Sequence, residues 1–217
     1  FSNHIKYSRS IMLKSLTIYL CSIITLSWTF PTYAEISINE LFFSNEKPFH
    51  LKLLDVLPNE AKIEYGPEDA ENTIIEFMDY YCGFCKKIHP ELINIADERD
   101  DVRLVFLHYP VISENSKTIA KFIIAAGFQN KSFDLHHSIF SMSGSLTQKK
   151  LDQAIEKSGI NKTKLKIDLG RPEIDKIIHI SSFLAGGIGA RGTPAIFINE
   201  EFVAGYISKQ QIISLLK

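Results

Sequence analysis

The stretch EFMDYYCGFCKKIHPEL, Glu76 to Leu92, contains the change of pattern on which the fold prediction rests. Before Cys82 the apolar residues fall at nearly successive positions, and from Cys85 onward they fall three and four positions apart. The first pattern is typical of a strand covered on both faces, and the second of a helix with one apolar stripe. The sequence therefore predicts a strand that leads directly into a helix, with a pair of cysteines at the junction.

The place of the two cysteines predicts thiols of unequal reactivity. A thiolate is the reactive form of cysteine, so a redox cysteine needs surroundings that hold negative charge. At or just before the first helical residue, Cys82 faces unpaired N–H groups and the positive end of the helix dipole. Cys85 lies one turn further, on the apolar stripe. We expect Cys82 to attack and leave, and Cys85 to resolve a mixed disulfide.

A C-x-x-C pair also occurs in metal sites. Structural zinc takes four ligands, and the sequence has neither a second cysteine pair nor an H-x-x-x-H motif, so we expect no metal and no other cofactor. An exported binding module whose thiols hold a soft ion such as Cu(I) is the alternative from another class. The stretch 187–192 fits G-x-G-x-x-G, but it follows a helix and precedes a strand, the reverse of a dinucleotide-binding site.

Glu76 stands on a predicted strand whose neighbours are apolar on both faces. An unpaired carboxylate there is costly, so we expect Glu76 either to pair with Arg103 or a lysine, or to have a raised pKa. Our hypothesis is that Glu76 exchanges protons with Cys85, and a purely structural ion pair is the alternative.

The sequence supports specific expectations for four residues that follow the cysteines in the predicted helix. Lys86 and Lys87 favour a solvated helix face over a catalytic role. His89 falls on the apolar stripe, which favours a packed, hydrogen-bonded histidine. Pro90 lacks an N–H group, and its place inside the helix predicts a kink.

The remaining pattern predicts a crossover unit, a helical stretch and a hairpin. A strand, a helix and a second parallel strand form a right-handed crossover. The apolar spacing changes from alternating to helical and back along the chain. The expected elements are a short helix, a break and an extended lead-in between 35 and 58, a strand at 102–108, helices between 113 and 170, one of them opened by a capping box at Ser145 and Gln148, a long helix from Pro172 to Gly187, strands AIFI and FVAGY, and a last helix from 208 to 217.

The N-terminal residues have the order of a secretory signal peptide. Met12 and Lys14 precede an apolar run from Leu16 to Phe30, and a small residue, Ala34, follows. We interpret 12–34 as a cleaved signal, which predicts an exported protein. An uncleaved membrane anchor is the alternative, although the run is shorter than the roughly 20 residues that span a bilayer.

Composition excludes one class of partner. The 217 residues carry a formal net charge of −1, and lysines and glutamates are evenly scattered. No basic stripe is present that would follow a phosphate backbone, so we expect no nucleic acid partner.

Taken together, EFMDYYCGFCKKIHPEL, the helical stretch and RGTPAIFIN at 191–199 resemble the DsbA-like group of thioredoxin-fold thiol-disulfide oxidoreductases of the bacterial periplasm. The resemblance covers roughly 61–217 and implies an α/β thioredoxin fold with an inserted helical subdomain. It implies a thioredoxin-fold domain at 61–112 and 171–217, a helical insertion at 113–170, and an N-terminal extension at 35–60.

The resemblance also implies a substrate-binding place. In that family the corresponding proline is cis, so Pro194 is expected to be cis and Thr193 to lie against the cysteines, where a substrate segment adds as a strand. Gly83 and Phe84 between the cysteines, together with Thr193, depart from DsbA and are similar to disulfide isomerases. We therefore expect a milder oxidant than DsbA, whose potential is about −120 mV.

The function implied is a protein disulfide oxidoreductase or isomerase that forms or reshuffles disulfides in exported proteins through a mixed disulfide at Cys82. Its partners would be the thiols and disulfides of unfolded or misfolded exported proteins and a membrane redox protein that recycles the site. Oxidase and isomerase both stay open at this point, and so does a homo-oligomer in which 35–60 forms a stalk.

Overall fold

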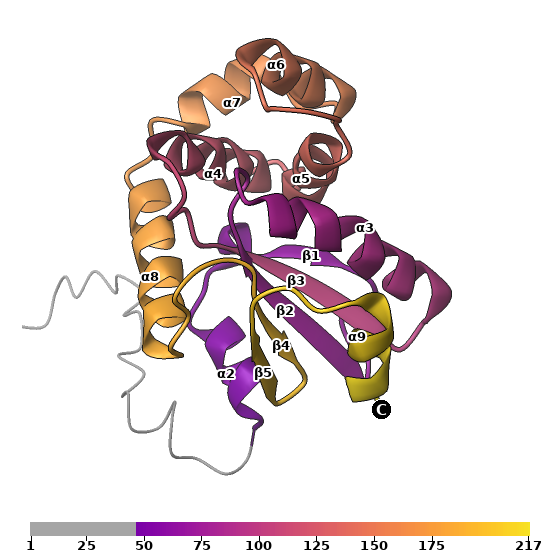
Figure 1. Cartoon of the computed structure of the whole chain (residues 1–217). Coiled ribbons are helices and arrows are strands. Elements are labelled where there is room, and N and C mark those ends of the chain that lie inside the picture. Colours follow the sequence, from indigo (N-terminus) through magenta and orange to yellow (C-terminus); the bar gives the residue numbers. More distant parts are fainter. Residues whose placement is uncertain (1–46) are drawn as a thin grey trace, which may run out of the picture. The chain divides into compact units, whose positions relative to one another are not determined.

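A five-stranded sheet lies at the centre of residues 47–217, the part that the computed structural model describes (Figure 1). The expected signal peptide at 12–34 lies outside these residues. The strand order is β1-β3-β2-β4-β5. β2 and β3 are parallel and the other neighbouring pairs are antiparallel. The strands are β1 (Ile63–Tyr65), β2 (Asn72–Met78), β3 (Val102–His108), β4 (Ala195–Ile198) and β5 (Glu201–Ala204).

The central strand β2 is covered on both faces. All seven of its residues are buried. Glu76 lies opposite Phe106 of β3, and Phe106 contacts His89 of helix α3 (Gly83–Glu98), so this face of the sheet packs on α3. Phe197 of β4 contacts Phe49 of helix α2 (Phe49–Asp55) on the other face. The predicted crossover from β2 through α3 to β3 and the β4–β5 hairpin are both confirmed.

Helices follow β3 without an intervening strand. In Figure 1, α4 to α7 gather at the top of the view and α8 runs down its left side. Helix α4 packs against α5, α7 and α8, and α9 packs against α3. The long helix ends at the expected glycine pair. The remaining helices are η1 (Asn59–Ala61), α4 (Glu114–Gly127), α5 (Ser132–Phe140), α6 (Gln148–Lys157), α7 (Lys162–Asp168), α8 (Glu173–Gly187) and α9 (Lys209–Leu215).

Two local predictions are wrong. The helix expected to start with a capping box at Ser145 and Gln148 is capped by Thr147, whose side chain accepts a hydrogen bond from the Lys150 N–H group. The extended lead-in around 51–54 is helix α2. The spacing of Leu53, Leu54 and Leu57 is helical, and all three are buried in the core. The short strand β1 was not predicted.

The part of the expected extension that the structure describes belongs to the core. Leu53 is 1% exposed and Leu57 is 4% exposed, and both join the apolar cluster that surrounds the sheet. Residues 47–60 therefore pack as part of the core around the sheet. Among the described helices, none has the length and apolar character needed to cross a bilayer.

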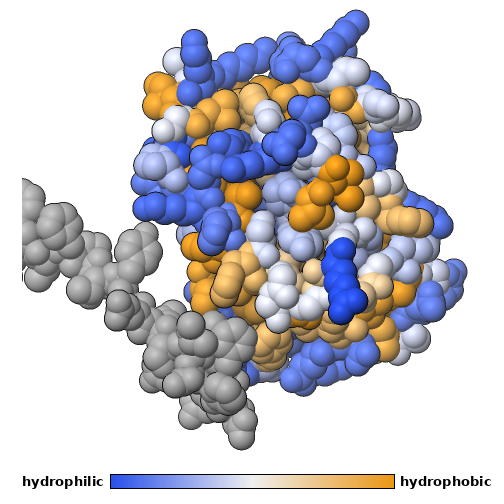
Figure 2. All heavy atoms as spheres, turned by 60° about the vertical axis from the view of Figure 1, so that its left-hand side comes forward, coloured by the Kyte–Doolittle hydropathy of each residue, from blue (hydrophilic) through white to orange (hydrophobic). Residues whose placement is uncertain are grey.

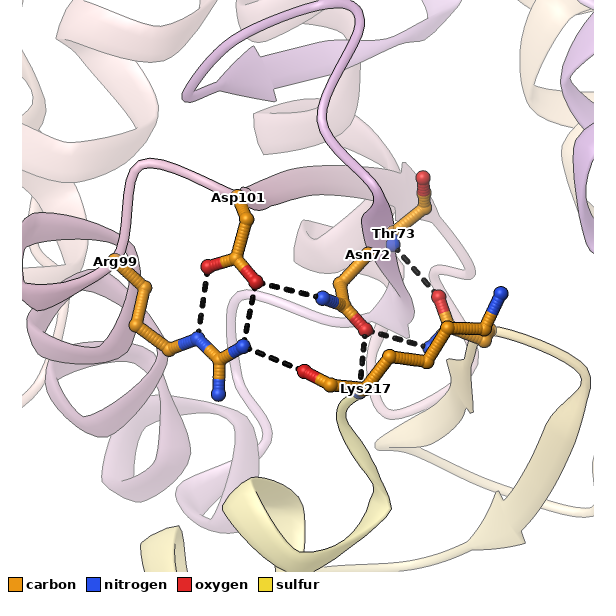
Figure 3. A network of polar contacts seen from close by, with 6 residues as sticks. Asn72, Thr73, Arg99, Asp101 and Lys217 are labelled. Atoms are coloured by element: carbon orange, nitrogen blue, oxygen red, sulfur yellow. Dashed lines mark hydrogen bonds and ion pairs between the residues drawn. The ribbon is translucent and has the colours of Figure 1, made fainter.

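A polar network fixes the start of β2 (Figure 3). The side chain of Asn72 donates to Asp101 at 3.0 Å and accepts from the backbone N–H of Lys217 at 2.8 Å and from Asn199 at 2.9 Å. Asn199 in turn accepts from the N–H of Thr73 at 2.9 Å. The hairpin turn, the α3–β3 loop and the last residue are thus joined at one end of the strand. The chain leaves the other end to form the cysteine turn.

Candidate active site

Cys82 is the N-cap residue of α3. Its backbone is extended, with φ −79° and ψ 116°, and its Sγ accepts a hydrogen bond from the N–H group of Cys85 at 3.4 Å. An N-cap side chain satisfies one of the free N–H groups of the first helical turn. The sulfur therefore lies at the positive end of the helix, as its place in the sequence predicts.

Thr193 also contacts Cys82. The Cys82 thiol donates to the carbonyl oxygen of Thr193 at 3.1 Å. The Thr193–Pro194 peptide bond is cis, and the Pro194 carbonyl accepts a hydrogen bond from the N–H of Gly205 at 2.9 Å. The loop before β4 and the start of α3 are thus in direct contact, although 111 positions separate the two residues.

The surroundings give the two thiols opposite acidities. Hydrogen bonds lower the pKa of Cys82 to about 5; the largest contribution comes from the Cys85 side chain, and the Thr193 side chain and the N–H groups of Cys85 and Phe84 add to it. Burial raises the pKa of Cys85 far above its ordinary value, and the Cys82 side chain and the Glu76 charge add to this. Both cysteines are free thiols. Their exposure is similar, 6% for Cys82 against 0% for Cys85.

Glu76 is buried beneath Cys85 without a countercharge. Burial raises its pKa to about 8, while a hydrogen bond with Cys85 opposes the rise. The prediction that Glu76 pairs with Arg103 is wrong, because Arg103 forms an ion pair with Glu64 of β1 at 3.0 Å. Arg103 stands three positions from Phe106, the residue opposite Glu76, so alternation places its side chain on the other face of the sheet. No lysine pairs with Glu76 within residues 47–217. Burial without a countercharge instead favours the raised pKa, which was the other expectation.

Asp79 organises the turn between β2 and α3, and we did not single it out from the sequence. Its carboxylate accepts four hydrogen bonds, at 2.7 to 2.8 Å, from the Ser116 hydroxyl and the N–H groups of Tyr81, Val111 and Ile112. These bonds tie the cysteine turn to the loop before α4. An acid directly after a buried strand was the only signal for this role.

Histidines form a buried cluster beside the site. His136 of α5 bonds Tyr80 through Nδ1 at 2.9 Å, and Nε2 of His89 bonds Nδ1 of His137 at 3.1 Å. His89 is thus a packed, hydrogen-bonded residue, as predicted. Burial lowers the pKa of His89 and of His108 to about 3. The rings of His89, His108 and His136 are therefore neutral near pH 7 and pack between α3, β3 and α5.

The two lysines after the cysteines differ from each other. Lys87 is exposed and lies over the ring of Tyr206, 4.0 Å from its centre, on the expected solvated face. Lys86 is half-buried and donates to the carbonyl of Gly144 at 2.9 Å, so a solvated face is the wrong description for it.

Phe84 and Gly83, the residues between the cysteines, are both exposed. Phe84 keeps 59% of its surface in contact with solvent, and its ring centre lies 6.0 Å from that of Tyr206. Val111 and Ile112 are also exposed. On the face that Figure 2 presents, apolar areas are interrupted by hydrophilic side chains. Within the described part of the chain, no group of three or more His, Cys, Asp or Glu side chains is arranged to hold a metal ion.

The chain matches one protein family and is similar to several solved structures. A family model described as Thioredoxin matches residues 58–217. The fold is similar to a thioredoxin-like oxidoreductase from Silicibacter pomeroyi DSS-3, with 28% identity, a TM-score of 0.68, and 75% of this chain and 93% of that chain covered. A periplasmic thioredoxin-like protein from Salmonella enterica serovar Typhimurium is 23% identical with a TM-score of 0.67, covering 76% and 93% of the chains. The thiol-disulfide exchange protein alpha-DsbA2 from Wolbachia pipientis is 21% identical with a TM-score of 0.64, covering 75% and 94%.

Curated sequences of greater length also match. A Na(+)/H(+) antiporter NhaA 1 from Mycolicibacterium gilvum is 25% identical over 164 residues, which cover 73% of this chain and 26% of the antiporter. The chain thus spans about a quarter of the length of the first curated relatives that it matches.

Proposed function

Because this chain belongs to the thioredoxin family and carries two thiols of opposite acidity at the start of a helix, we propose that it is a thiol-disulfide oxidoreductase of exported proteins. The predicted fold class and the resemblance to DsbA-like oxidoreductases are confirmed. The likeness to known oxidoreductases supports the enzyme class, and the difference between the two thiols is the observation that carries the proposal.

Each thiol takes one step of the exchange. The Cys82 thiolate attacks a substrate disulfide and forms a mixed disulfide, and one substrate sulfur leaves as a thiolate. Cys85, once deprotonated, attacks Sγ of Cys82, so the protein is left with a Cys82–Cys85 disulfide and the substrate with two thiols. The same steps run backward when the oxidised protein gives its disulfide to a reduced substrate. The stability of the Cys82 thiolate makes it a good leaving group in that direction.

Glu76 is proposed to accept the proton of Cys85. The two buried side chains perturb each other's pKa, and a carboxyl with a pKa of about 8 gains and loses protons near neutral pH. A buried thiol needs such a base, since its own pKa lies far above neutrality.

Thr193 and Pro194 are proposed to border the substrate. The contact of Thr193 with the Cys82 sulfur supports a place for an extended substrate segment along this loop. Exposed Phe84, two positions after Cys82, would cover part of the same segment. Gly83 leaves the approach to Cys82 without a side chain.

Location and partners complete the proposal. The sequence pattern at 12–34 supports export to the periplasm, and the similar Salmonella protein is described as periplasmic. Unfolded or misfolded exported proteins would be the substrates, and a membrane redox protein would recycle the site. Formation and reshuffling of disulfides use the same steps, so the assay must include both a reduced and a scrambled substrate.

Trapping of the intermediate tests the proposal. A Cys85→Ser variant mixed with a scrambled, disulfide-containing protein should accumulate a covalent complex that dithiothreitol releases. A Cys82→Ser variant should form none, because only Cys82 is expected to attack. Equal complexes from both variants, or none from either, would contradict the proposed function.

A further inference from the structure

A cavity of about 160 Å³ lies beside Cys82. Its walls come from the cysteine turn, the end of α5 and the loop between α5 and α6. The volume is that of a side chain rather than of a single water molecule. The apolar part of the lining consists of Tyr80, Tyr81, Ile139, Phe140, Met142 and Leu146.

Two lysines, Lys86 and Lys150, are the charged residues of the lining. Lys86 donates to the Gly144 carbonyl at 2.9 Å, and Lys150 donates to the carbonyls of Ser143 and Ser145 at 2.5 and 2.9 Å. An ammonium group has three N–H donors. Lys86 therefore has two N–H donors left and Lys150 has one. Together these donors suit the two oxygens of a carboxylate.

The charge of these lysines is not neutralised within the described residues. Neither takes part in any of the ion pairs that residues 47–217 form. Carbonyl oxygens orient both ammonium groups but carry no full charge. Hydrogen bonds, rather than a lysine, make the main contributions that stabilise the Cys82 thiolate. Two positive charges therefore face a largely apolar cavity, where attraction for an anion is stronger than in open water.

We propose that this cavity is a specificity subsite that takes an acidic side chain next to the reacting cysteine of a substrate, with Lys86 and Lys150 as its anion-binding residues. The inference rests on the proposed function and adds a substrate class to it. A carboxylate would form charge-assisted hydrogen bonds with both ammonium groups while its stem packs on the apolar wall. The cavity opens at Cys82, so only residues adjacent to the substrate sulfur reach it.

A kinetic comparison of matched peptides tests the subsite. The Cys85→Ser protein reacts with peptides whose cysteine carries a thionitrobenzoate group. Cys82 forms the bond to the peptide sulfur, and thionitrobenzoate leaves as a coloured thiolate. Peptides differ only in Glu, Gln or Lys at one position beside the cysteine, in one series before it and one after it.

In at least one series, the Glu peptide should react about five to ten times faster than the Gln peptide, and the Lys peptide slower still. Added salt should reduce the preference. The double variant Lys86→Gln/Lys150→Gln should lower the ratio of the Glu-peptide rate to the Gln-peptide rate to less than about twofold. The double variant Lys86→Arg/Lys150→Arg should retain the original ratio.

Lys149→Gln is the matched control, because it removes the same charge from the neighbouring exposed position of α6 and lies outside the cavity. It should leave the ratio unchanged. Equal rates for Glu and Gln peptides in both series overturn the subsite, as does a preference that survives the double Gln change. In those cases the proposed function still stands, since all peptides react. Failure of every peptide to react would overturn both.

Discussion

Replacing Glu76 by Gln should make the reduced protein more stable at neutral and alkaline pH. The carboxyl has an ordinary pKa of 4.5 and a folded-state pKa of about 8, so between these values the folded protein holds a proton that the unfolded chain has lost. The free energy of unfolding therefore falls as pH rises, by about 1.4 kcal/mol per pH unit. The loss reaches about 3 kcal/mol at pH 7 and about 4 kcal/mol at pH 8.

Gln has the shape of protonated Glu and does not ionise, so the variant escapes this loss. Urea unfolding of the reduced proteins at pH 4.5, 7 and 8 should give nearly equal stability at the lowest pH and a growing advantage for Glu76→Gln above it. Resolution of mixed disulfides should at the same time become slower, since the base is gone. Glu64→Gln, a change on the neighbouring part of the sheet at a partly exposed residue, should show no such gain.

The reasoning would be refuted if Glu76→Gln were equal to or less stable than the unchanged protein at pH 8. That result would mean that the carboxylate is paired or hydrated in the folded state. A gain in stability without slower resolution would leave the burial of Glu76 intact and remove its role as a base.

Three further outcomes follow from the same structure. Both ring nitrogens of buried His108 lack a partner, and its pKa falls from 6.5 to about 3, so the unfolded chain binds the extra proton between these values and stability is lost as pH falls below 6.5. The free energy of unfolding of His108→Leu, measured relative to the unchanged protein by thermal or urea unfolding, should therefore be about 2 kcal/mol higher at pH 5 than at pH 7.5. A difference that does not depend on pH would contradict this. Asp79→Ala removes the acceptor of four hydrogen bonds and should lower the free energy of unfolding by about 3 kcal/mol or more, whereas exposed Asp134→Ala should change it by less than about 1 kcal/mol. Equilibration with glutathione should give the Cys82–Cys85 couple a potential below the roughly −120 mV of DsbA, because Gly83 and Phe84 supply no imidazole, and a value as high as that of DsbA would refute the expectation.

The sequence predicted those parts of the fold that depend on local spacing. The change from strand to helix at Cys82, the parallel crossover and the hairpin after Pro194 all follow from the apolar pattern near each element. Helix α2 was misjudged because Leu51 and Leu53 alternate like a strand, while the contacts of Leu54 and Leu57 with the core select the helix.

The candidate site was less predictable where it depends on register. The sequence placed Cys82 at the helix start and Glu76 on a buried strand, but the face that Arg103 occupies follows from its alignment beside β2. Lys86 and Lys150 are separated by 64 positions and meet only because α3 and the α5–α6 loop border one cavity. Asp79 likewise bonds residues 32 to 37 positions away. No local pattern encodes such contacts.

The acidity of the Cys82 thiol is the property on which the account depends most directly. Ultraviolet absorbance of the thiolate in the reduced protein, followed as a function of pH, should show a transition with a midpoint near pH 5. The transition should disappear in Cys82→Ser and move upward in Cys85→Ala, which lacks the largest of the stabilising hydrogen bonds. A midpoint close to the ordinary value of 9.0, or a transition that persists without Cys82, would contradict the account.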